Sequence, residues 1–290
     1  MLYTLPDREI ERFIEEDVPY GDLTTSLLGI GAVRGEISFT SRENTVLCCT
    51  EEAARVLEKS GAGIFCCMES GTCIMPGVTF LKAQGPAANL HTAWKVALNL
   101  LEYGSGIATR THAIVTKARQ ANPGIVVVTT RKSFPGTKKI AIKAIMAGGA
   151  MPHRLGLSET ILVFGRHRSF LPGSQSFADT VSSLKKRAPE HKVIAEADSF
   201  DEALSFACSG ADVVQVDKMK PEILSELAER IHRESPGVAV SAAGGINADN
   251  ASVYAATGID IMVLSSVYFG KPSDIAVSLR PLERAETSDE

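Results

Sequence analysis

The chain has 290 residues, of which 44% are hydrophobic and 22% charged, and its formal net charge at pH 7 is −4. This length allows one large domain or two, and the composition is that of an ordinary globular protein. The acidic balance argues against a general nucleic-acid or membrane-surface binder, since such proteins carry a basic excess. The sequence lacks a signal peptide at its start and any apolar run near the roughly 20 residues of a spanning helix, so we expect a cytoplasmic protein.

The first hundred residues predict a mixed α+β domain. Asp7–Glu16 has the apolar spacing of a short amphipathic helix, and Glu51–Lys59 predicts a second helix that ends at Gly61. Four strands are predicted in the same region, at Glu36–Thr40, Thr45–Cys49, Ile64–Met68 and Val78–Ala83. Two longer helices, Asn89–Tyr103 and Ile107–Ala121, are then expected on either side of the small-residue joint Gly104–Gly106.

From Ile125 onward, apolar strands alternate with helical segments. The strands are predicted at Ile125–Thr130, Ile161–Phe164, Val193–Ala197, Val213–Asp217, Val238–Ala243 and Ile259–Ser265. The helices are predicted at Lys138–Ala147, Ser176–Arg187, Phe200–Ser209, Pro221–Arg233 and Ala248–Thr257. Strands covered on both faces by crossover helices form a parallel sheet, and six strands fall short of the eight of a complete barrel.

We therefore predict an α/β fold, an incomplete (open) α/β barrel of about six parallel strands, together with an N-terminal α+β sandwich domain. A doubly wound sheet is the alternative. The N-terminal domain is expected over residues 1–103 and the barrel over residues 104–269. The C-terminal segment 270–290 is polar at its end, but Ile275–Leu279 could pack back on the first domain.

Six cysteines include the vicinal pairs Cys48-Cys49 and Cys66-Cys67. Neither pair has the Cys-x-x-Cys spacing of zinc or thioredoxin-like sites. Adjacent cysteines in a strand point to opposite faces. We interpret the cysteines as small core hydrophobes in a reducing compartment rather than as metal ligands.

A basic segment, residues 129–168, stands out in this acidic chain. It contains eight lysines and arginines but a single acidic residue, Glu159. Arg131 and Lys132 directly follow a predicted strand, at the end where catalytic groups of α/β barrels lie. His153-Arg154 follows on a later loop and offers forked recognition of a carboxylate or phosphate. The pattern indicates a pocket for a small polyanionic substrate.

Two carboxylates are predicted at the same rim, because Glu196 and Asp217 each lie at the end of a strand. Acids that face a cationic pocket suit a divalent metal or sugar hydroxyl groups. The alternative is that each acid caps a helix or pairs with a lysine such as Lys218.

A glycine pair, Gly244-Gly245, links a strand to a helix and can bring backbone N–H groups to a phosphate, as can Ser265-Ser266 after the next strand. A plain tight turn is the alternative for the glycines. A Schiff base on Lys132 or Lys143 is also conceivable on a barrel, although no spacing supports it.

With these residues in view, the chain resembles the quinolinate phosphoribosyltransferase family. The matching segments are Tyr20–Thr25, Ser105–Thr109, Thr130–Lys132 with Pro135-Gly136, Gly148-Gly149 with His153-Arg154, Glu196, Asp217, Gly244-Gly245 and Tyr254–Asp260. The resemblance implies a two-domain enzyme that uses phosphoribosyl pyrophosphate and Mg²⁺. It also implies a homodimer or higher homo-oligomer with sites shared between subunits. The composition and the basic segment already predict small anionic substrates, and neither nucleic acid nor membrane as a partner.

Candidate site residues follow from the motifs and the resemblance together. The expected catalytic residues are Lys132, Glu196 and Asp217, the last two also holding Mg²⁺, directly or indirectly. The expected substrate-binding residues are Lys95, Thr130, Arg131, His153, Arg154 and Phe164. The expected phosphate-binding residues are Ala243, Gly244, Gly245, Ser265 and Ser266.

Several positions depart from the family pattern. Phe164 replaces a pocket lysine, Lys95 stands for a substrate-binding arginine, and Ser265 replaces a glycine. Ser241 and Ile194 stand where the family has acids. These changes resemble the ModD branch of the family, which is associated with molybdenum transport.

We therefore expect a phosphoribosyltransferase whose acceptor is an aromatic nitrogen compound other than quinolinate. The alternatives are a non-catalytic oxyanion- or ligand-binding paralogue linked to molybdate transport and, last, a Schiff-base aldolase.

Overall fold

The chain forms two compact units in the computed structural model, which describes residues 3–173 and 176–282. Unit 1 takes in the chain up to Thr109, Pro135–Gly149 and the chain from Phe269 onward, and unit 2 takes in Arg110–Phe134 and Ala150–Tyr268. The domain boundary expected between residues 103 and 104 lies inside one helix, α4 (Ala87–Ala121), and stays a prediction. None of the described helices is long and apolar enough to cross a membrane.

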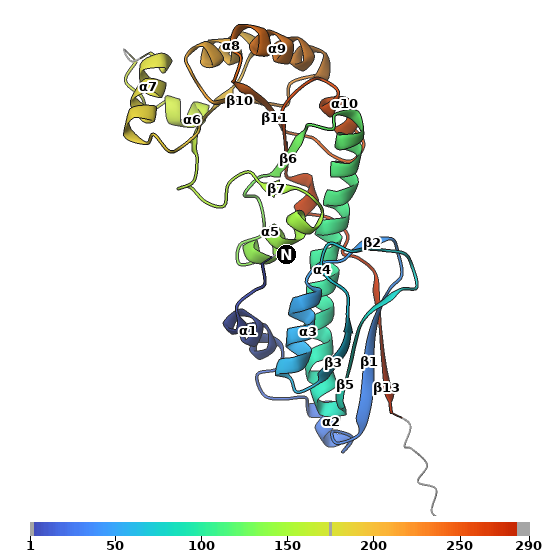
Figure 1. The fold of residues 1–290 in the computed structure, drawn as a ribbon. Helices are drawn as coiled ribbons and strands as arrows, with labels where there is room; N and C mark the ends of the chain where they lie inside the picture. Colours follow the sequence, from blue (N-terminus) through green and yellow to red (C-terminus); the bar gives the residue numbers. More distant parts are fainter. Residues whose placement is uncertain (1–2, 174–175, 283–290) are drawn as a thin grey trace, which may run out of the picture. The chain divides into compact units, whose positions relative to one another are not determined.

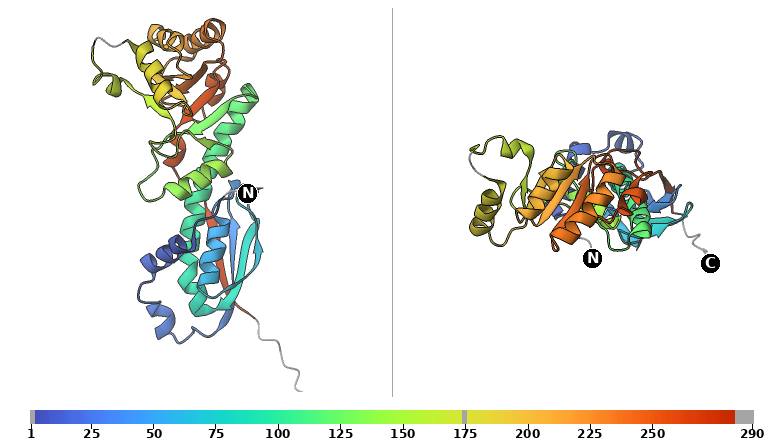
Figure 2. Two further views of the ribbon diagram at one scale, coloured as in Figure 1. Left: turned by 60° about the vertical axis from the view of Figure 1, so that its left-hand side comes forward. Right: turned by 90° about the horizontal axis from the view of Figure 1, so that it is seen from above.

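Unit 1 is built on an antiparallel sheet with the strand order β13-β1-β5-β3 (Figure 1). Its strands are β1 (Arg34–Ser41), β3 (Gly63–Cys67), β5 (Thr79–Pro86) and β13 (Ile275–Pro281). Burial alternates along β1, with Ile37 and Phe39 fully buried, because successive side chains of a strand point to opposite faces. Helix α3 (Thr50–Lys59) packs on β3 and β5, and α1 (Asp7–Asp17) packs on α3 (Figure 2). This arrangement confirms the α+β prediction.

The remaining elements of unit 1 are short, apart from α4. They are α2 (Leu23–Leu27), β2 (Thr45–Val46), β4 (Cys73–Ile74) and α5 (Lys138–Ala147). β13 pairs with β1 along its whole length, from Ile275 opposite Ser41 to Pro281 opposite Gly35. The end of the chain as described therefore completes the sheet of unit 1.

The predicted strand Thr45–Cys49 is wrong at its end, because β2 stops at Val46. Cys49 directly precedes α3 with a left-handed backbone (φ 62°), so the vicinal pair does not lie in a strand. Cys48 and Cys49 are fully buried, as expected of core residues. The expectation is wrong for the exposed cysteines, Cys67, Cys73 and Cys208. The cysteines are free, and the described residues contain no cluster of ligand side chains suited to a metal ion.

The break predicted at Gly104–Gly106 is also wrong, because α4 runs without interruption through these residues. A Cβ atom at Gly104 would lie 2.8 Å from Cys49 Sγ, and one at Gly106 would lie 3.0 Å from the backbone of Lys271 and Pro272. Ser105 Oγ accepts a hydrogen bond from Cys48 N at 3.0 Å. The small residues therefore allow close packing against the helix, which offsets the weak helix propensity of glycine.

Unit 2 contains a seven-stranded sheet in the order β7-β6-β12-β11-β10-β9-β8. The strands are β6 (Val126–Thr129), β7 (Met151–Pro152), β8 (Ile161–Val163), β9 (Val193–Ala197), β10 (Val213–Asp217), β11 (Ala239–Ala243) and β12 (Ile261–Leu264), and all their pairings are parallel. The six predicted strands and the open-barrel class are confirmed. β7 was missed because two residues carry no periodicity.

Helices cover the outer face of this sheet, where α8 and α9 lie over β9, β10 and β11 (Figure 1). The helices of unit 2, besides the last part of α4, are α6 (Gly165–Arg168), α7 (Phe177–Arg187), α8 (Phe200–Cys208), α9 (Pro221–Glu234), α10 (Ala251–Ala255) and the 3₁₀ turn η1 (Ser266–Tyr268). Ser199 begins α8 by accepting a hydrogen bond from Glu202 N, and Pro221 at the first turn begins α9.

The inner face of the sheet is apolar at depth and polar toward the carboxyl ends of the strands. Leu162, Ile194 and Val213 form one buried cluster on this face. Because side chains alternate along a strand, Glu196 follows Ile194 and Gln215 follows Val213 on the same face, nearer the carboxyl end. The sheet also curls, since Arg154 after β7 lies 5.9 Å from the ring of Phe164 after β8, at the opposite edge. The polar side chains thus line a hollow.

Candidate active site

A cavity of about 810 Å³ opens at the carboxyl ends of the strands of unit 2. Such ends are where α/β barrels carry their sites. Its lining consists of Thr130, Arg131, Lys132, His153, Arg154, Leu162, Phe164, Gly165, Arg166, Glu196, Asp198, Gln215, Asp217, Ala243, Gly244, Val263 and Ser265. The sequence-derived cations and acids are therefore brought together within one hollow.

The first cationic segment of the cavity is Arg131-Lys132, which leaves β6 directly after Thr130. The end of β6 is held in place by Tyr268, whose hydroxyl donates to Thr130 O at 2.9 Å and is hydrogen-bonded to the Thr129 hydroxyl at 2.8 Å. Thr130 N also donates to Leu264 O of β12. These bonds fix the backbone from which the two cations project.

The second cationic segment is His153-Arg154, which follows β7. His153 N donates to Thr129 O at 3.0 Å, so this segment is tied to the end of β6. Burial, and then the charge of Arg154, lower the pKa of His153. Burial, and then the charge of Arg131, lower the pKa of Arg154. Positive charge is thus crowded here, and a bound anion would relieve the repulsion.

An aromatic wall adjoins these cations. The half-buried Phe164 ring is stacked on His167, with ring centroids 5.5 Å apart, and the Arg154 guanidinium lies 5.9 Å from its centroid. Phe164 N donates to His167 Nδ1 at 3.1 Å, which holds the ring pair together. A flat ligand ring could stack on this surface.

Acids lie on the neighbouring strands. Glu196 on β9 accepts a hydrogen bond from Gln215 Nε2 at 2.7 Å, and Asp217 ends β10. Burial raises the pKa of Glu196, and the charges of Asp217 and Asp198 raise it further, against the donation from Gln215. A carboxylate disfavoured in this way is stabilised by a bound cation or by hydroxyl donors.

Gly244 is required by the position of Asp217. Its backbone is left-handed (φ 87°), and a Cβ atom there would lie 2.2 Å from Asp217 Oδ1 and 2.6 Å from Lys218 Cγ. The next glycine, Gly245, is also left-handed (φ 75°), but a Cβ atom there would meet nothing within 4 Å. Only the first glycine therefore makes room for an acid of the cavity.

The expected phosphate-binding residues divide into two groups. Ala243, Gly244 and Ser265 line the cavity, whereas Gly245 and Ser266 do not. Ser266 Oγ instead donates to Ile246 O at 2.9 Å and so ties η1 to the glycine loop. Ser266 therefore stabilises the glycine loop in this structure and does not face the cavity.

Comparison with models of known protein families shows which family the chain belongs to. The model of the N-terminal domain of quinolinate phosphoribosyl transferase matches residues 22–105, and the model of its C-terminal domain matches residues 107–278. The chain belongs to the quinolinate phosphoribosyltransferase family.

Two relatives of the chain within this family carry different names. A Rhodobacter capsulatus protein named "Putative pyrophosphorylase ModD" is 40% identical over 251 residues, 87% of this chain and 96% of the relative. A Methanothermobacter thermautotrophicus protein named "Probable nicotinate-nucleotide pyrophosphorylase", of the carboxylating kind, is 29% identical over 282 residues, 94% of this chain and 99% of the relative. The structure of the nicotinate-nucleotide pyrophosphorylase of Francisella tularensis has the same fold, with a TM-score of 0.87 at 22% identity over 97% of this chain and 99% of that one.

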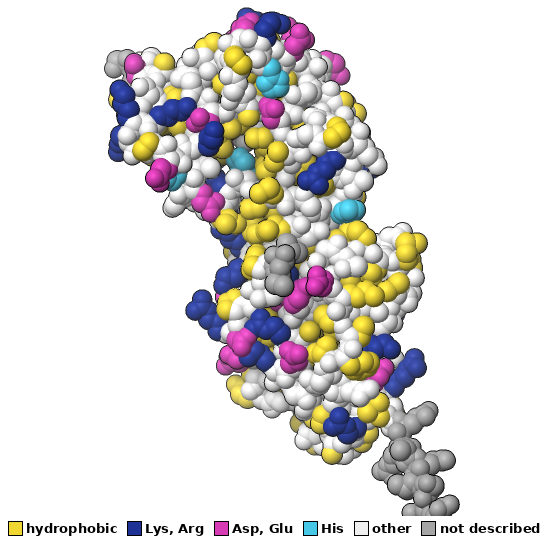
Figure 3. All heavy atoms as spheres, viewed as in Figure 1, with side chains coloured by type: hydrophobic (Ala, Val, Ile, Leu, Met, Phe, Trp, Pro, Cys, Tyr) yellow, Lys and Arg dark blue, Asp and Glu magenta, His cyan; other side chains and the backbone are white. Residues whose placement is uncertain are grey.

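The basic segment of this family member does not form a single pocket. Arg131, Lys132, Arg154 and Arg166 line the cavity, and none of them forms an ion pair within residues 3–173 and 176–282. Arg168 pairs with Asp198 and Glu202, and Lys138, Lys139 and Lys143 lie on α5 in unit 1. On the face seen in Figure 3, basic and acidic side chains are interspersed without a continuous basic area.

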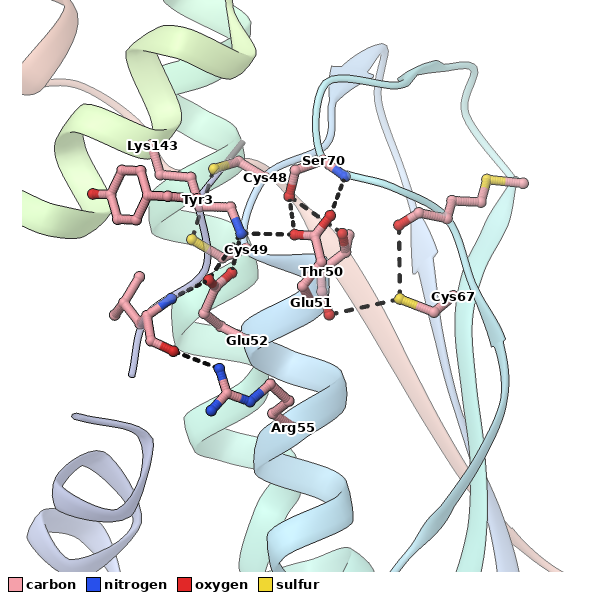
Figure 4. A network of polar contacts seen from close by, with 12 residues as sticks. Tyr3, Cys48, Cys49, Thr50, Glu51, Glu52, Arg55, Cys67, Ser70 and Lys143 are labelled. Atoms are coloured by element: carbon pink, nitrogen blue, oxygen red, sulfur yellow. Dashed lines mark hydrogen bonds and ion pairs between the residues drawn. The ribbon is translucent and has the colours of Figure 1, made fainter. Parts of the chain in front are cut away.

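Lys143 is buried away from solvent in unit 1, among carboxylates (Figure 4). Its Nζ donates to Glu51 Oε2 at 2.8 Å and to both oxygens of Glu52, at 2.8 and 2.6 Å. Burial opposes the charge, but these bonds prevail and raise the pKa of Lys143. Lys143 is enclosed by two carboxylates and does not line the cavity, so the structure gives the Schiff-base alternative no support at this residue.

Lys95 is the one expected site residue that lies in unit 1, on α4. Its Nζ lies 5.3 Å from the ring centroid of Trp94, and it does not line the cavity of unit 2. Its role in substrate binding stays a prediction.

Sequence reasoning missed two polar residues of the cavity, Asp198 and Gln215, and counted Arg166 in the basic segment without naming it as a site residue. Asp198 lies two residues after Glu196, and Arg166 lies two residues after Phe164, so both could have been found by examining the residues that follow each predicted strand. Gln215 lies two residues before Asp217 in an otherwise apolar strand, VVQVD, and that isolated polar side chain was the signal for it.

Proposed function

We propose that this protein transfers phosphoribose from phosphoribosyl pyrophosphate to an aromatic nitrogen acceptor other than quinolinate and releases pyrophosphate. Membership of the family supports this class of reaction. The observation that carries the proposal is one cavity with cations at the ends of β6 and β7 and acids at the ends of β9 and β10. A sugar that bears phosphates on both sides matches this distribution of charge.

The chemistry follows from positions and charges rather than from a covalent protein intermediate. The acceptor nitrogen forms a bond to ribose C1 while the bond from C1 to pyrophosphate breaks, and the electron pair leaves with pyrophosphate. Arg131, His153 and Arg154 would hold the acceptor carboxylate or the leaving pyrophosphate, and Lys132 would stabilise the charge that develops on the leaving group. Glu196 and Asp217 would bind the ribose hydroxyls and stabilise positive charge on the sugar.

The 5′-phosphate of the sugar would lie at the glycine loop. Ala243, Gly244 and Ser265 line the cavity there, with Gly245 and Ser266 on the same loops. Backbone N–H groups of such left-handed glycine turns favour an anion.

Mg²⁺ fits these residues as an ion carried by the diphosphate. Burial, and then the charges of Asp217 and Asp198, raise the pKa of Glu196, and a bound cation would offset both effects. The described residues nevertheless offer no cluster of three ligand side chains. Glu196 and Asp217 would hold the ion together with phosphate and water oxygens, and the ion would neutralise charge on the diphosphate.

The acceptor would be a flat ring with few charges. Phe164 offers a stacking surface beside Arg154, and the family resemblance places a lysine at that position. Loss of a cation weakens binding of a dicarboxylate, whereas the ring favours stacking. A panel of pyridine, pyrimidine and pterin-like acids, assayed for pyrophosphate release, would find the acceptor.

Two measurements test the proposal. In calorimetry, phosphoribosyl pyrophosphate with Mg²⁺ should bind. In an assay of turnover, Glu196→Ala should lower pyrophosphate release about 100-fold, a typical effect of losing one electrostatic contact in a site. Glu226→Ala, an exposed acid on α9, is the matched control and should keep full activity. Tight molybdate binding without any response to the sugar would instead identify a non-catalytic oxyanion binder.

We also propose a homodimer, which the family resemblance supports. In unit 1 the side chains of Tyr20, Leu23 and Leu27 are 99%, 71% and 78% exposed, which is unusual for apolar residues so close in sequence. Sedimentation should give twice the mass of the chain, and a monomer at micromolar concentration would contradict it.

A further inference from the structure

Gln215 occupies the centre of a polar row across the sheet of unit 2. It lies on β10 directly opposite Glu196 on β9 and Ser241 on β11. It is only 4% exposed, although it lines the cavity. No motif of the sequence assigned it a role.

The amide of Gln215 makes a single hydrogen bond with the residues that the structure describes. Its Nε2 donates to Glu196 Oε2 at 2.7 Å, while its Oε1 is buried and has no partner. Ser241 Oγ on the neighbouring strand is likewise buried without a partner. Burying an amide with an unsatisfied oxygen costs folding free energy. The fold gains little from Gln215 in return, so we look for its purpose in the bond to Glu196.

The neutral donor suits the surroundings of Glu196. Asp217 and Asp198 face this carboxylate with negative charge, and Arg166 faces it with positive charge. A lysine in place of Gln215 would pair with the acid and cancel its charge, whereas an amide binds one oxygen and leaves the charge for a ligand.

We propose that Gln215 is a positioning residue, which fixes the Glu196 carboxylate so that one oxygen is held by the amide and the other is left for the ribose hydroxyls. The role toward the ribose hydroxyls rests on the proposed transfer reaction, whereas the first test concerns only the contact between Gln215 and Glu196. The amide holds Glu196 Oε2 at 2.7 Å, so loss of the amide must leave the carboxylate free to turn.

The first test compares crystal structures of the ligand-free parent protein and its variants. Gln215→Met keeps much of the volume but removes the donor, and Gln215→Glu places a second acid beside the first. The Glu196 carboxylate should leave its parent orientation in both variants, because the bond to its Oε2 is lost. Ser241→Ala is the matched control, since it removes an equally buried polar atom that does not contact Glu196, and it should leave the carboxylate in place.

The second test measures phosphoribosyl pyrophosphate binding and turnover. Gln215→Met should bind the sugar about tenfold more weakly, the effect of losing one hydrogen bond to a charged group. An unchanged Glu196 orientation in a folded Gln215→Met protein overturns the inference whatever the activity. A displaced carboxylate in a protein that never binds the sugar supports the positioning role and refutes the proposed function instead.

Discussion

Each unit contains a cluster of basic and acidic side chains, but among the described residues the charges are paired in unit 1 and largely unpaired in the cavity of unit 2. In unit 1, Lys143 and Glu52 are fully buried, and Lys143 binds Glu51 and Glu52 at 2.6–2.8 Å (Figure 4). Both acids also accept further hydrogen bonds, Glu51 from Ser70 N and Oγ and Glu52 from Leu5 N. In unit 2, by contrast, Arg131 and Arg154 on one side of the cavity form no ion pair with any described residue.

The difference separates charges that hold the fold from charges that await a ligand. A saturated cluster lowers the pKa of an acid and raises that of a lysine, as at Glu51 and Lys143. At Arg154 and Glu196 no ion pair with a described residue offsets burial, so burial first, and then like charges, lower the pKa of Arg154 and raise that of Glu196. Perturbed groups occur in both places, so only the direction of the change distinguishes a binding site from a structural network.

Removal of Lys143 should produce the largest effect. Lys143→Met leaves Glu52 buried without a cation, which typically costs about 3–5 kcal/mol, and denaturant unfolding should show this loss. Lys139→Met is the control, because Lys139 lies on the same helix but pairs with Glu9 at the surface, where an ion pair contributes about 0–1 kcal/mol. Equal losses in the two variants would remove the distinction between the clusters.

Removal of a cavity cation should spare stability but weaken binding. Arg154→Met relieves the repulsion from Arg131, so the free energy of unfolding should stay the same or rise by up to about 1 kcal/mol. Affinity for phosphoribosyl pyrophosphate should fall at least about tenfold in calorimetry, since a charged contact is lost. A marked loss of stability would show that Arg154 serves the fold after all.

The glycine loop offers a paired comparison of smaller size. Gly244→Ala and Gly245→Ala both impose left-handed strain of about 1–2 kcal/mol, but only the first places a methyl group against Asp217. Sugar binding should therefore fall about tenfold further in Gly244→Ala than in Gly245→Ala. Equal affinities would mean that Asp217 does not contact the ligand.

Acid should weaken the paired cluster gradually. Burial opposes ionisation, but donation from Lys143 and Ser70 lowers the pKa of Glu51 from its ordinary value of 4.5 to about 2. The stabilisation is complete above pH 4.5 and is lost as the pH falls toward 2. The free energy of unfolding should thus decline less steeply over this range in Glu51→Gln than in the parent protein, with the exposed Glu58→Gln as control. An unchanged slope would contradict the pairing.

Much of unit 2 was predictable because its strands are apolar runs between amphipathic helices. The ends of those runs are enough to place Arg131, Glu196 and Asp217 at one edge of the sheet, since the carboxyl ends of parallel strands meet there. Unit 1 was harder. Gly104–Gly106 has the composition of a break, yet contacts with Cys49 and Pro272 keep the helix continuous.

The charges of the basic segment were the least predictable feature. Lys143 and Arg131 look alike in the sequence, and only their tertiary partners distinguish a buried ion pair from a wall of the cavity. Gln215 was overlooked for the same reason, because its importance lies in one contact across neighbouring strands.

The sequence by itself determined the strand order along the chain, the open barrel and the family, because periodicity and motifs are local properties. The tertiary structure alone decided which charges are paired and which line the cavity. Electrostatic energy depends on distance and burial, and neither quantity is written in the spacing of residues along a chain.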